Sequence, residues 1–171
     1  SDVCSSDLEL CEILKAEIAD RVKLPVSGLS TAALGATRSW AGAFCVTLYD
    51  HADEVQSALP AGVQCLTLRG RSIARSVMGE TQPPPDATVT VISRWPDFLK
   101  WAHTTLAAVG IHPDSLDTRD ARRAGWKRGL TTDAFLITDY RVSKELPKGC
   151  RPRVFRIISD ESLAEIISGT V

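Results

Sequence analysis

The chain has 171 residues, of which 44% are hydrophobic and 24% are charged, and its formal net charge is −1. These values are typical of one globular domain or of two small lobes, and they exclude a strongly basic nucleic-acid-binding protein. Its apolar runs are shorter than the roughly 20 residues of a membrane-spanning helix, and no secretory signal opens the chain. We therefore expect a cytoplasmic protein without membrane contact.

The first 36 residues are predicted to lie outside the main fold. Residues 1–8, SDVCSSDL, resemble the translation of a sequencing adapter, so we expect an artefactual or disordered tail. Residues 9–36 are interpreted as a helical linker, because Glu9–Lys23 has the period of an amphipathic helix. We expect the apolar stripe of this helix to contact a second copy in a homodimer. The stripe consists of Leu10, Cys11, Leu14, Ile18 and Val22.

Residues 37–171 alternate between strand and helix patterns, which predicts one α/β ligand-sensing domain. Asp50 and Asp160 are each expected to cap a helix that follows them. Further helices are expected over residues 72–78 and over part of Arg119–Leu130. The expected strands are Ala43–Leu48, Val63–Leu68, Thr88–Ile92, a short Leu116–Thr118, Ala134–Thr138 and Val154–Ile158.

The most complete strand–helix unit is Ala87–Gly110. Its strand is β-branched throughout, which suits a buried setting. Pro96 suits the first turn of the helix, and Gly110 can adopt the left-handed conformation that ends it. A strand leading into an amphipathic helix is half of a βαβ unit. We therefore expect a mostly parallel sheet with flanking helices, either doubly wound or divided into two small Rossmann-like lobes.

An internal linker is expected at Gly79–Ala87, GETQPPPDA. Neither a helix nor a central strand accommodates its three consecutive prolines. If the domain has two lobes, the break between them is expected at residues 79–87.

Ligands of open parallel sheets bind outside the carboxyl ends of the strands, and this rule selects the candidate ligand-binding residues. Two of the loops that follow the predicted strands carry an arginine and a serine just before a helix, and the first N–H groups of a helix attract anions. We therefore expect a small anionic ligand, although a helix cap beside a solvated arginine is the alternative for each loop. The selected residues are Tyr49, His51, Arg69, Arg71, Ser72, Ser93, Arg94, Trp95 and Asp139.

Patterns that indicate catalysis, cofactors or metals are poor. The chain lacks GxGxxG, GxxxxGK[ST] and GxSxG motifs, and its three histidines and five cysteines lack metal-binding spacing. We expect no enzymatic activity, no cofactor, no metal, and reduced thiols. One alternative is a small doubly wound transferase or hydrolase that uses Asp50, His51, Ser93 and Asp139. A receiver-like interaction domain is another.

A basic stretch at Arg119–Arg128 contains five basic residues and Trp126. Such a patch can bind nucleic acid. The nearby Asp114, Asp117 and Asp120 favour instead a solvated face with one packed tryptophan.

Three segments together resemble the carboxyl-terminal effector-sensing domain of bacterial transcriptional regulators of the GntR type. They are VTLYDHADEVQSALP at Val46–Pro60, VTVISRWPDFLKWAHTTLAAVGI at Val89–Ile111 and FLITDYRVSKELP at Phe135–Pro147, and RVFRIISDESLAEI follows at Arg153–Ile166. The resemblance is one of element pattern over about Ala43–Ile167. It implies a small-molecule effector and a regulator that contacts DNA only through an amino-terminal winged helix-turn-helix domain. No such motif is visible in this sequence, and Leu10–Val22 would be the helix that joins the two domains.

Overall fold

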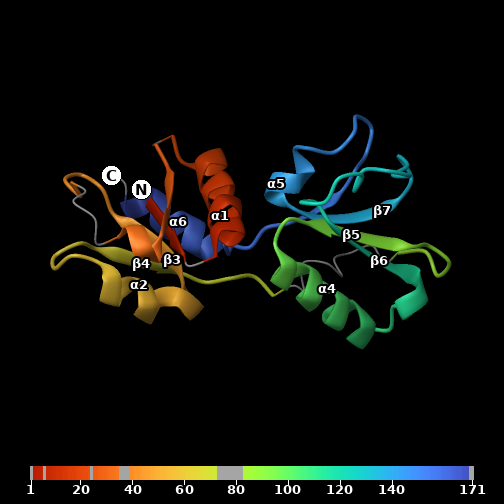
Figure 1. The fold of residues 1–171 in the computed structure, drawn as a ribbon, viewed down its shortest axis with the longest axis horizontal. Helices are drawn as coiled ribbons and strands as arrows, with labels where there is room; N and C mark the ends of the chain where they lie inside the picture. Colours follow the sequence, from red (N-terminus) through yellow and green to blue (C-terminus); the bar gives the residue numbers. More distant parts are fainter. Residues whose placement is uncertain (1, 6, 24, 35–38, 73–82, 170–171) are drawn as a thin grey trace. The chain divides into compact units, whose positions relative to one another are not determined.

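The computed structural model describes residues 2–5, 7–23, 25–34, 39–72 and 83–169. The chain divides into two compact units (Figure 1). Unit 1 comprises Ser1–Gly70 and Ile157–Val171, and unit 2 comprises Arg71–Arg156. Each unit contains a four-stranded sheet in which the paired strands are parallel. The predicted α/β class, with mostly parallel strands and flanking helices, is therefore confirmed.

Unit 1 is built on a sheet with the strand order β2-β1-β3-β4. Its strands are β1 (Asp2–Ser5), β2 (Ser27–Ser30), β3 (Cys45–Leu48) and β4 (Cys65–Leu68). Helix α1 (Leu8–Arg21) connects β1 to β2, helix α2 (Ala52–Ala58) connects β3 to β4, and α6 (Asp160–Gly169) lies near the carboxyl end of the chain. The 3-10 turns η1 (Thr31–Ala33) and η2 (Tyr49–His51) follow β2 and β3.

The amino-terminal residues belong to this sheet, which corrects the predicted tail and linker. Strand β1 pairs with both β2 and β3, so it is a central strand. Helix α1 is the crossover that two parallel strands require. Strand β2 has the sequence SGLS, whose small polar residues carry no strand pattern. The adapter origin of residues 1–8 stays a prediction.

The apolar stripe of α1 is buried within the chain. Four of its five residues are at most 2% exposed, and Val22 is 7% exposed. The helix contacts β1 and β2, both of which the sequence prediction had left out of the fold. The stripe is therefore part of the core of unit 1 and not the dimer contact that we predicted.

Unit 2 has a sheet of the same kind, with the strand order β6-β5-β7-β8. Its elements are β5 (Val89–Ser93), α4 (Pro96–Ala108), η3 (Pro113–Ser115), β6 (Leu116–Asp120), β7 (Phe135–Asp139), α5 (Tyr140–Ser143) and β8 (Arg153–Phe155). All five residues of β5 are buried, as its β-branched sequence predicts. The predicted helix at 72–78 lies outside the described residues except for Ser72.

Helix α4 follows its predicted pattern. Pro96 is its first residue, and Phe98, Ala102 and Leu106 form its buried face. Gly110 has a φ of 96°, and the Ile111 N–H donates to the Leu106 carbonyl at 3.0 Å. This left-handed glycine ends the helix as expected.

The segment after β6 differs from the partly helical structure that we predicted. The chain forms consecutive turns over residues 121–129, in which Gly125 and Gly129 have φ angles of 80° and 69°. Arg119 donates to the carbonyls of Trp126 at 3.0 Å and Arg128 at 2.6 Å, which holds the turns against β6. Part of the basic stretch is therefore used to support its own loop.

The chain enters and leaves unit 2 at places other than the predicted break at 79–87. It leaves unit 1 after Gly70 and returns at Ile157, so α6 belongs to unit 1. Residues 37–171 are thus divided between two units, which agrees with the predicted alternative of two small lobes but not with the predicted position of the break. Within unit 1, Gly70 and Ile158 form an antiparallel bridge, and the Ser159 N–H donates to the Arg69 carbonyl at 3.0 Å. None of the helices in the described part of the chain is both long and apolar enough to span a membrane.

Candidate functional site

The strand order places a topological switch point between β5 and β7 of unit 2. The chain runs from β5 through α4 to β6 on one side, and then crosses to β7 on the other side of β5. Ligands of open α/β sheets bind at the carboxyl ends of the strands where the winding reverses in this way. Ser93 and Asp139 are the last residues of β5 and β7, so three of the predicted site residues, Ser93, Arg94 and Asp139, lie at this point.

A buried hydrogen bond between Ser93 and Asp139 joins the two strand ends at this site. The Ser93 hydroxyl donates to Asp139 Oδ2 at 2.5 Å and accepts the Trp95 N–H at 3.0 Å. Both side chains are 0% exposed. Ser93 and Asp139 therefore join β5 to β7 from inside the unit, where a ligand outside the sheet does not reach them.

Asp139 also begins the next helix. Its Oδ1 accepts the Val142 N–H at 2.8 Å, which caps α5. Burial raises the pKa of the Asp139 carboxyl and outweighs the hydrogen bonds from Ser93 and from backbone N–H groups, which lower it. The carboxyl group thus has the contacts of a structural cap in a setting that favours its protonated form.

Arg94 is the partly exposed charge of the site. Its Nη2 donates to Glu145 Oε2 at 2.9 Å, and the two side chains are 26% and 31% exposed. Helix α4 begins two residues later, and Trp95 at its N-cap makes no side-chain capping hydrogen bond. The guanidinium is therefore held beside a helix start whose peptide dipoles favour an anion.

Two aromatic residues pack around the strand ends. Trp95 is 4% exposed and meets Trp101 edge to face, with ring centroids 5.1 Å apart. The Tyr140 ring lies against two cations, Lys144 Nζ at 4.7 Å and the Arg156 guanidinium at 4.4 Å. Trp95, which we predicted as a ligand-binding residue, is thus a packing residue of the α4 start.

The other predicted residues lie elsewhere. Tyr49 and His51 follow β3 in unit 1, where Tyr49 is 72% exposed and His51 Nδ1 lies 4.0 Å from Glu54 Oε2. Helix α2 has His51 at its N-cap position without a side-chain capping bond, so the predicted Asp50 cap is wrong. The candidate enzyme residues are split between unit 1 and unit 2.

Arg69, Arg71 and Ser72 follow β4, which is not a neighbour of β5. Strand β4 is an edge strand of the unit 1 sheet, whereas β5 is central in the unit 2 sheet. The Arg69 N–H donates to Ser162 Oγ at 2.9 Å, so this backbone is bound to the start of α6. Arg71 is half-buried and Ser72 is exposed.

An open cleft of about 550 Å³ lies beside the start of α4 at the carboxyl end of β6. Two of its three arginines are paired with Asp120: Arg122 Nη2 lies 2.7 Å and Arg123 Nε 3.9 Å from Asp120 Oδ2. The third, Arg119, is paired with Asp117. These contacts favour the solvated-face interpretation of the basic stretch over a nucleic-acid site.

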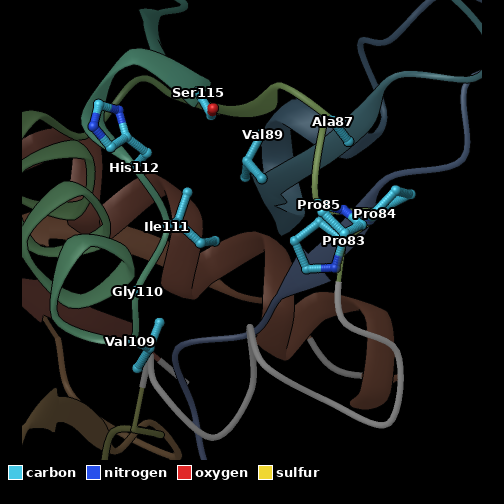
Figure 2. A pocket seen from close by; sticks show the side chains of 10 residues that line it. All are labelled: Pro83, Pro84, Pro85, Ala87, Val89, Val109, Gly110, Ile111, His112 and Ser115. Carbon is cyan, nitrogen blue, oxygen red and sulfur yellow. The ribbon is translucent and has the colours of Figure 1, made fainter.

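A second cavity, of about 220 Å³, lies at the opposite end of β5 (Figure 2). Val89, the first residue of β5, lines it together with Pro83, Pro84, Pro85 and Ile111. His112 and Ser115 add polar side chains to this lining. The cavity lies at the amino end of β5, whereas the ion pair of Arg94 with Glu145 lies at the carboxyl end.

Sequence reasoning missed two acidic residues that the structure places in important contacts. Glu145 is the partner of Arg94, and no local pattern marks it. Glu17 is fully buried, and its two carboxylate oxygens accept the N–H groups of Ile157 and Ile158 at 2.7 Å and 3.0 Å. Glu17 lies three residues after Leu14 on the buried face of α1. A charged residue at an apolar position of the helical pattern could have indicated a buried contact for Glu17.

Comparisons with protein-family models, with curated proteins and with solved structures found no match. The resemblance to GntR-type effector domains therefore stays a prediction.

Proposed function

We propose that this chain is the effector-sensing part of a cytoplasmic bacterial transcriptional regulator of the GntR type, and that it binds a small anionic metabolite without converting it. The observation that carries ligand binding is the switch point of unit 2. Arg94 lies there, partly exposed and held by Glu145, two residues before the uncapped start of α4. The regulatory role rests on the resemblance of the three sequence segments.

The anion is expected to contact Arg94 together with the first N–H groups of α4. A guanidinium offers several N–H donors, so a carboxylate or phosphate can approach it and compete with Glu145. A charge-assisted contact of this kind contributes roughly 1.5–3 kcal/mol. Ser93 and Asp139 act indirectly, because their hydrogen bond holds the two strand ends that carry Arg94 and Tyr140.

The burial of Ser93 and Asp139 favours binding over catalysis. A nucleophile or a general base must reach the reacting atom of its substrate. Both side chains are fully buried and bound to one another or to backbone N–H groups. The enzyme alternative therefore gains no support from these two of its four candidate residues.

A thermal-shift screen of the purified protein tests this proposal. The compounds are organic acids, amino acids and sugar phosphates, and a ligand at 100 times its Kd stabilises the folded state by about 2.7 kcal/mol. We expect an anionic compound to raise the Tm of the wild type, and Arg94→Ala to weaken its binding about tenfold. Arg21→Ala is the matched control, because it removes the same charge from an exposed position on α1.

Two outcomes contradict the proposal. If no anionic compound raises the Tm, the chain is not the proposed sensor. If Arg94→Ala retains the full shift, the ligand binds away from the switch point of unit 2.

The DNA contact of the proposed regulator is assigned to a winged helix-turn-helix domain outside this sequence, and a homodimer is part of the same proposal. A net charge of −1 gives this chain little overall electrostatic attraction to the phosphates of DNA. A gel shift at moderate salt is expected to show no sequence-selective binding. Selective retardation by this chain alone would contradict the assignment.

A further inference from the structure

Two cysteines face each other in the sheet of unit 1. Strands β3 and β4 are parallel neighbours, and Cys45 is the register partner of Cys65. Side chains that are directly opposite on adjacent strands point to the same face of the sheet. Adjacent strands lie about 4.7–4.9 Å apart, which falls inside the Cα separation of about 4.4–6.8 Å found in disulfides. Both cysteines are free thiols in this structure.

Both thiols lie beneath helix α2. Cys45 forms a buried cluster with Leu34 and Val55, and Cys65 packs against this cluster. The residues that surround them in this cluster are apolar, and the two thiols are hydrogen-bonded to each other. Cys45 is 0% exposed, whereas Cys65 is half-buried.

The two thiols also differ in reactivity. A hydrogen bond from the Cys45 thiol lowers the pKa of Cys65, and this effect outweighs burial, which raises it. The thiolate is the nucleophilic form of cysteine. Cys65 also lines an open pocket of about 260 Å³ together with Leu59, Pro60 and Gly62, residues at the turn between α2 and β4. A small reagent therefore has a path to Cys65 but not to Cys45.

We propose that Cys45 and Cys65 form a peroxide-sensitive dithiol, in which Cys65 reacts first and Cys45 closes a disulfide between β3 and β4. In the first step the Cys65 thiolate attacks one oxygen of hydrogen peroxide. The O–O bond breaks, Cys65 becomes a sulfenic acid, and hydroxide leaves and takes up a proton as water. In the second step the Cys45 sulfur attacks the Cys65 sulfur, the S–O bond breaks, and the Cys45 proton leaves with the oxygen as a second water. Two thiols and one peroxide thus give one disulfide and two waters.

Peptide mapping of the native protein tests this proposal directly. The protein is treated with hydrogen peroxide at near-stoichiometric concentration, and the remaining thiols are then alkylated under denaturing conditions. Trypsin releases both cysteines in one peptide, residues 39–69, because no lysine or arginine lies between Arg38 and Arg69. We expect this peptide to lose the mass of two hydrogens and to resist alkylation. Asp-N digestion before Asp50 then separates the two cysteines, which stay linked until a reductant is added.

Single substitutions assign the two roles. Cys45→Ser is expected to leave Cys65 as a sulfenic acid that dimedone traps, and Cys65→Ser is expected to leave Cys45 unoxidised. Cys150→Ser is the matched control, because Cys150 is also half-buried but lies in unit 2, and it should leave the linked peptide unchanged. The mapping of the wild type decides the question even if a variant fails to fold.

Three results would overturn the proposal. In the first, Cys65 stays reduced while Cys150 is oxidised. In the second, Cys65 reaches the sulfinic acid without a linked peptide. In the third, Cys65 links to a cysteine other than Cys45. Each result would show that the register pair does not act as a dithiol.

Discussion

At the scale of single residues, the ion pair of Arg94 with Glu145 is expected to contribute to stability. An exposed arginine contributes little to stability, whereas the side chains of this pair are only 26% and 31% exposed. We expect a double-mutant cycle with Arg94→Ala and Glu145→Ala to give a coupling free energy of about 1 kcal/mol that falls with added salt. Urea denaturation measures it.

The matched control for this cycle is Arg21 with Asp20. These side chains are 53% and 36% exposed, and their charged atoms lie 3.8 Å apart. Their coupling is expected to be a few tenths of a kcal/mol at most. Equal coupling in the two pairs would mean that Arg94 is a solvated charge.

The raised pKa of Asp139 determines whether this residue stabilises the protein at low or at high pH. The folded state holds this proton more tightly than the unfolded state, so the contribution of Asp139 to stability is fully present below its ordinary pKa of 3.8. It decreases as the pH rises from that value through the folded pKa. Asp139→Asn cannot ionise, so the wild type is expected to lose stability relative to this variant over that range. Urea denaturation at a series of pH values measures the difference.

Asp120 provides a control of opposite sign. Its hydrogen bond with Arg122 lowers the pKa of the Asp120 carboxyl. The wild type is therefore expected to gain stability relative to Asp120→Asn as the pH rises through the folded pKa, and to lose it again on acidification. Parallel pH profiles for the two variants would contradict the burial argument for Asp139.

At the scale of elements, the pairing of β1 with both β2 and β3 can be tested against the prediction of a disordered tail. A proline in a central strand removes a ladder N–H and cannot be accommodated there. We expect Val3→Pro to destabilise unit 1 by about 1–3 kcal/mol and to increase hydrogen exchange of the β2 and β3 amides. Val3→Ala is the control, because it keeps the N–H group. An unchanged exchange pattern in Val3→Pro would support the tail interpretation.

The element patterns explain which parts of the fold could be predicted. Strands β3, β4, β5 and β7 and helix α4 were predicted from their apolar and β-branched residues. Strands β6 and β8 were predicted with bounds that differ from those of the structure, Leu116–Asp120 and Arg153–Phe155. Strand β2 was missed because SGLS forms a strand only through its pairing with β1. The turns after β6 were taken in part for a helix, because the contacts of Arg119 with two distant carbonyls leave no local signal.

The candidate site shows the same division between local and long-range information. The carboxyl-end rule selected Ser93, Arg94 and Asp139, because the end of a strand is visible in the sequence. The partners of these residues are 46 to 51 positions away and depend on which strands become neighbours. The sequence therefore predicted where charges gather at unit 2, but not that Glu145 pairs with Arg94.

At the scale of the whole molecule, unit 2 is inserted in the sequence between two segments of unit 1. The ends of these two segments contact each other within unit 1. Gly70 bridges to Ile158, and Glu17 accepts the N–H groups of Ile157 and Ile158. Each unit has its own parallel sheet and its own buried cluster, one around Cys45 and the other around Ile92. Each unit therefore has what a small domain needs to fold alone.

We therefore expect both units to fold when they are separated. Residues 71–156 form one fragment, and in the other a short Gly-Ser linker joins Gly70 to Ile157. Domains of about 60 residues already fold alone, so each fragment is expected to unfold cooperatively in urea. Trp40 reports on unit 1, whereas Trp95, Trp101 and Trp126 report on unit 2.

Glu17→Ala within the linked unit 1 fragment is the informative variant. It leaves the N–H groups of Ile157 and Ile158 without their carboxylate acceptor inside the protein, which costs about 1–3 kcal/mol for each buried group that water does not reach. We expect this variant to unfold at lower urea concentration than the unaltered fragment. If the unaltered fragment already lacks a cooperative transition, the returning segment is held by more than unit 1, and the insertion is not an independent domain.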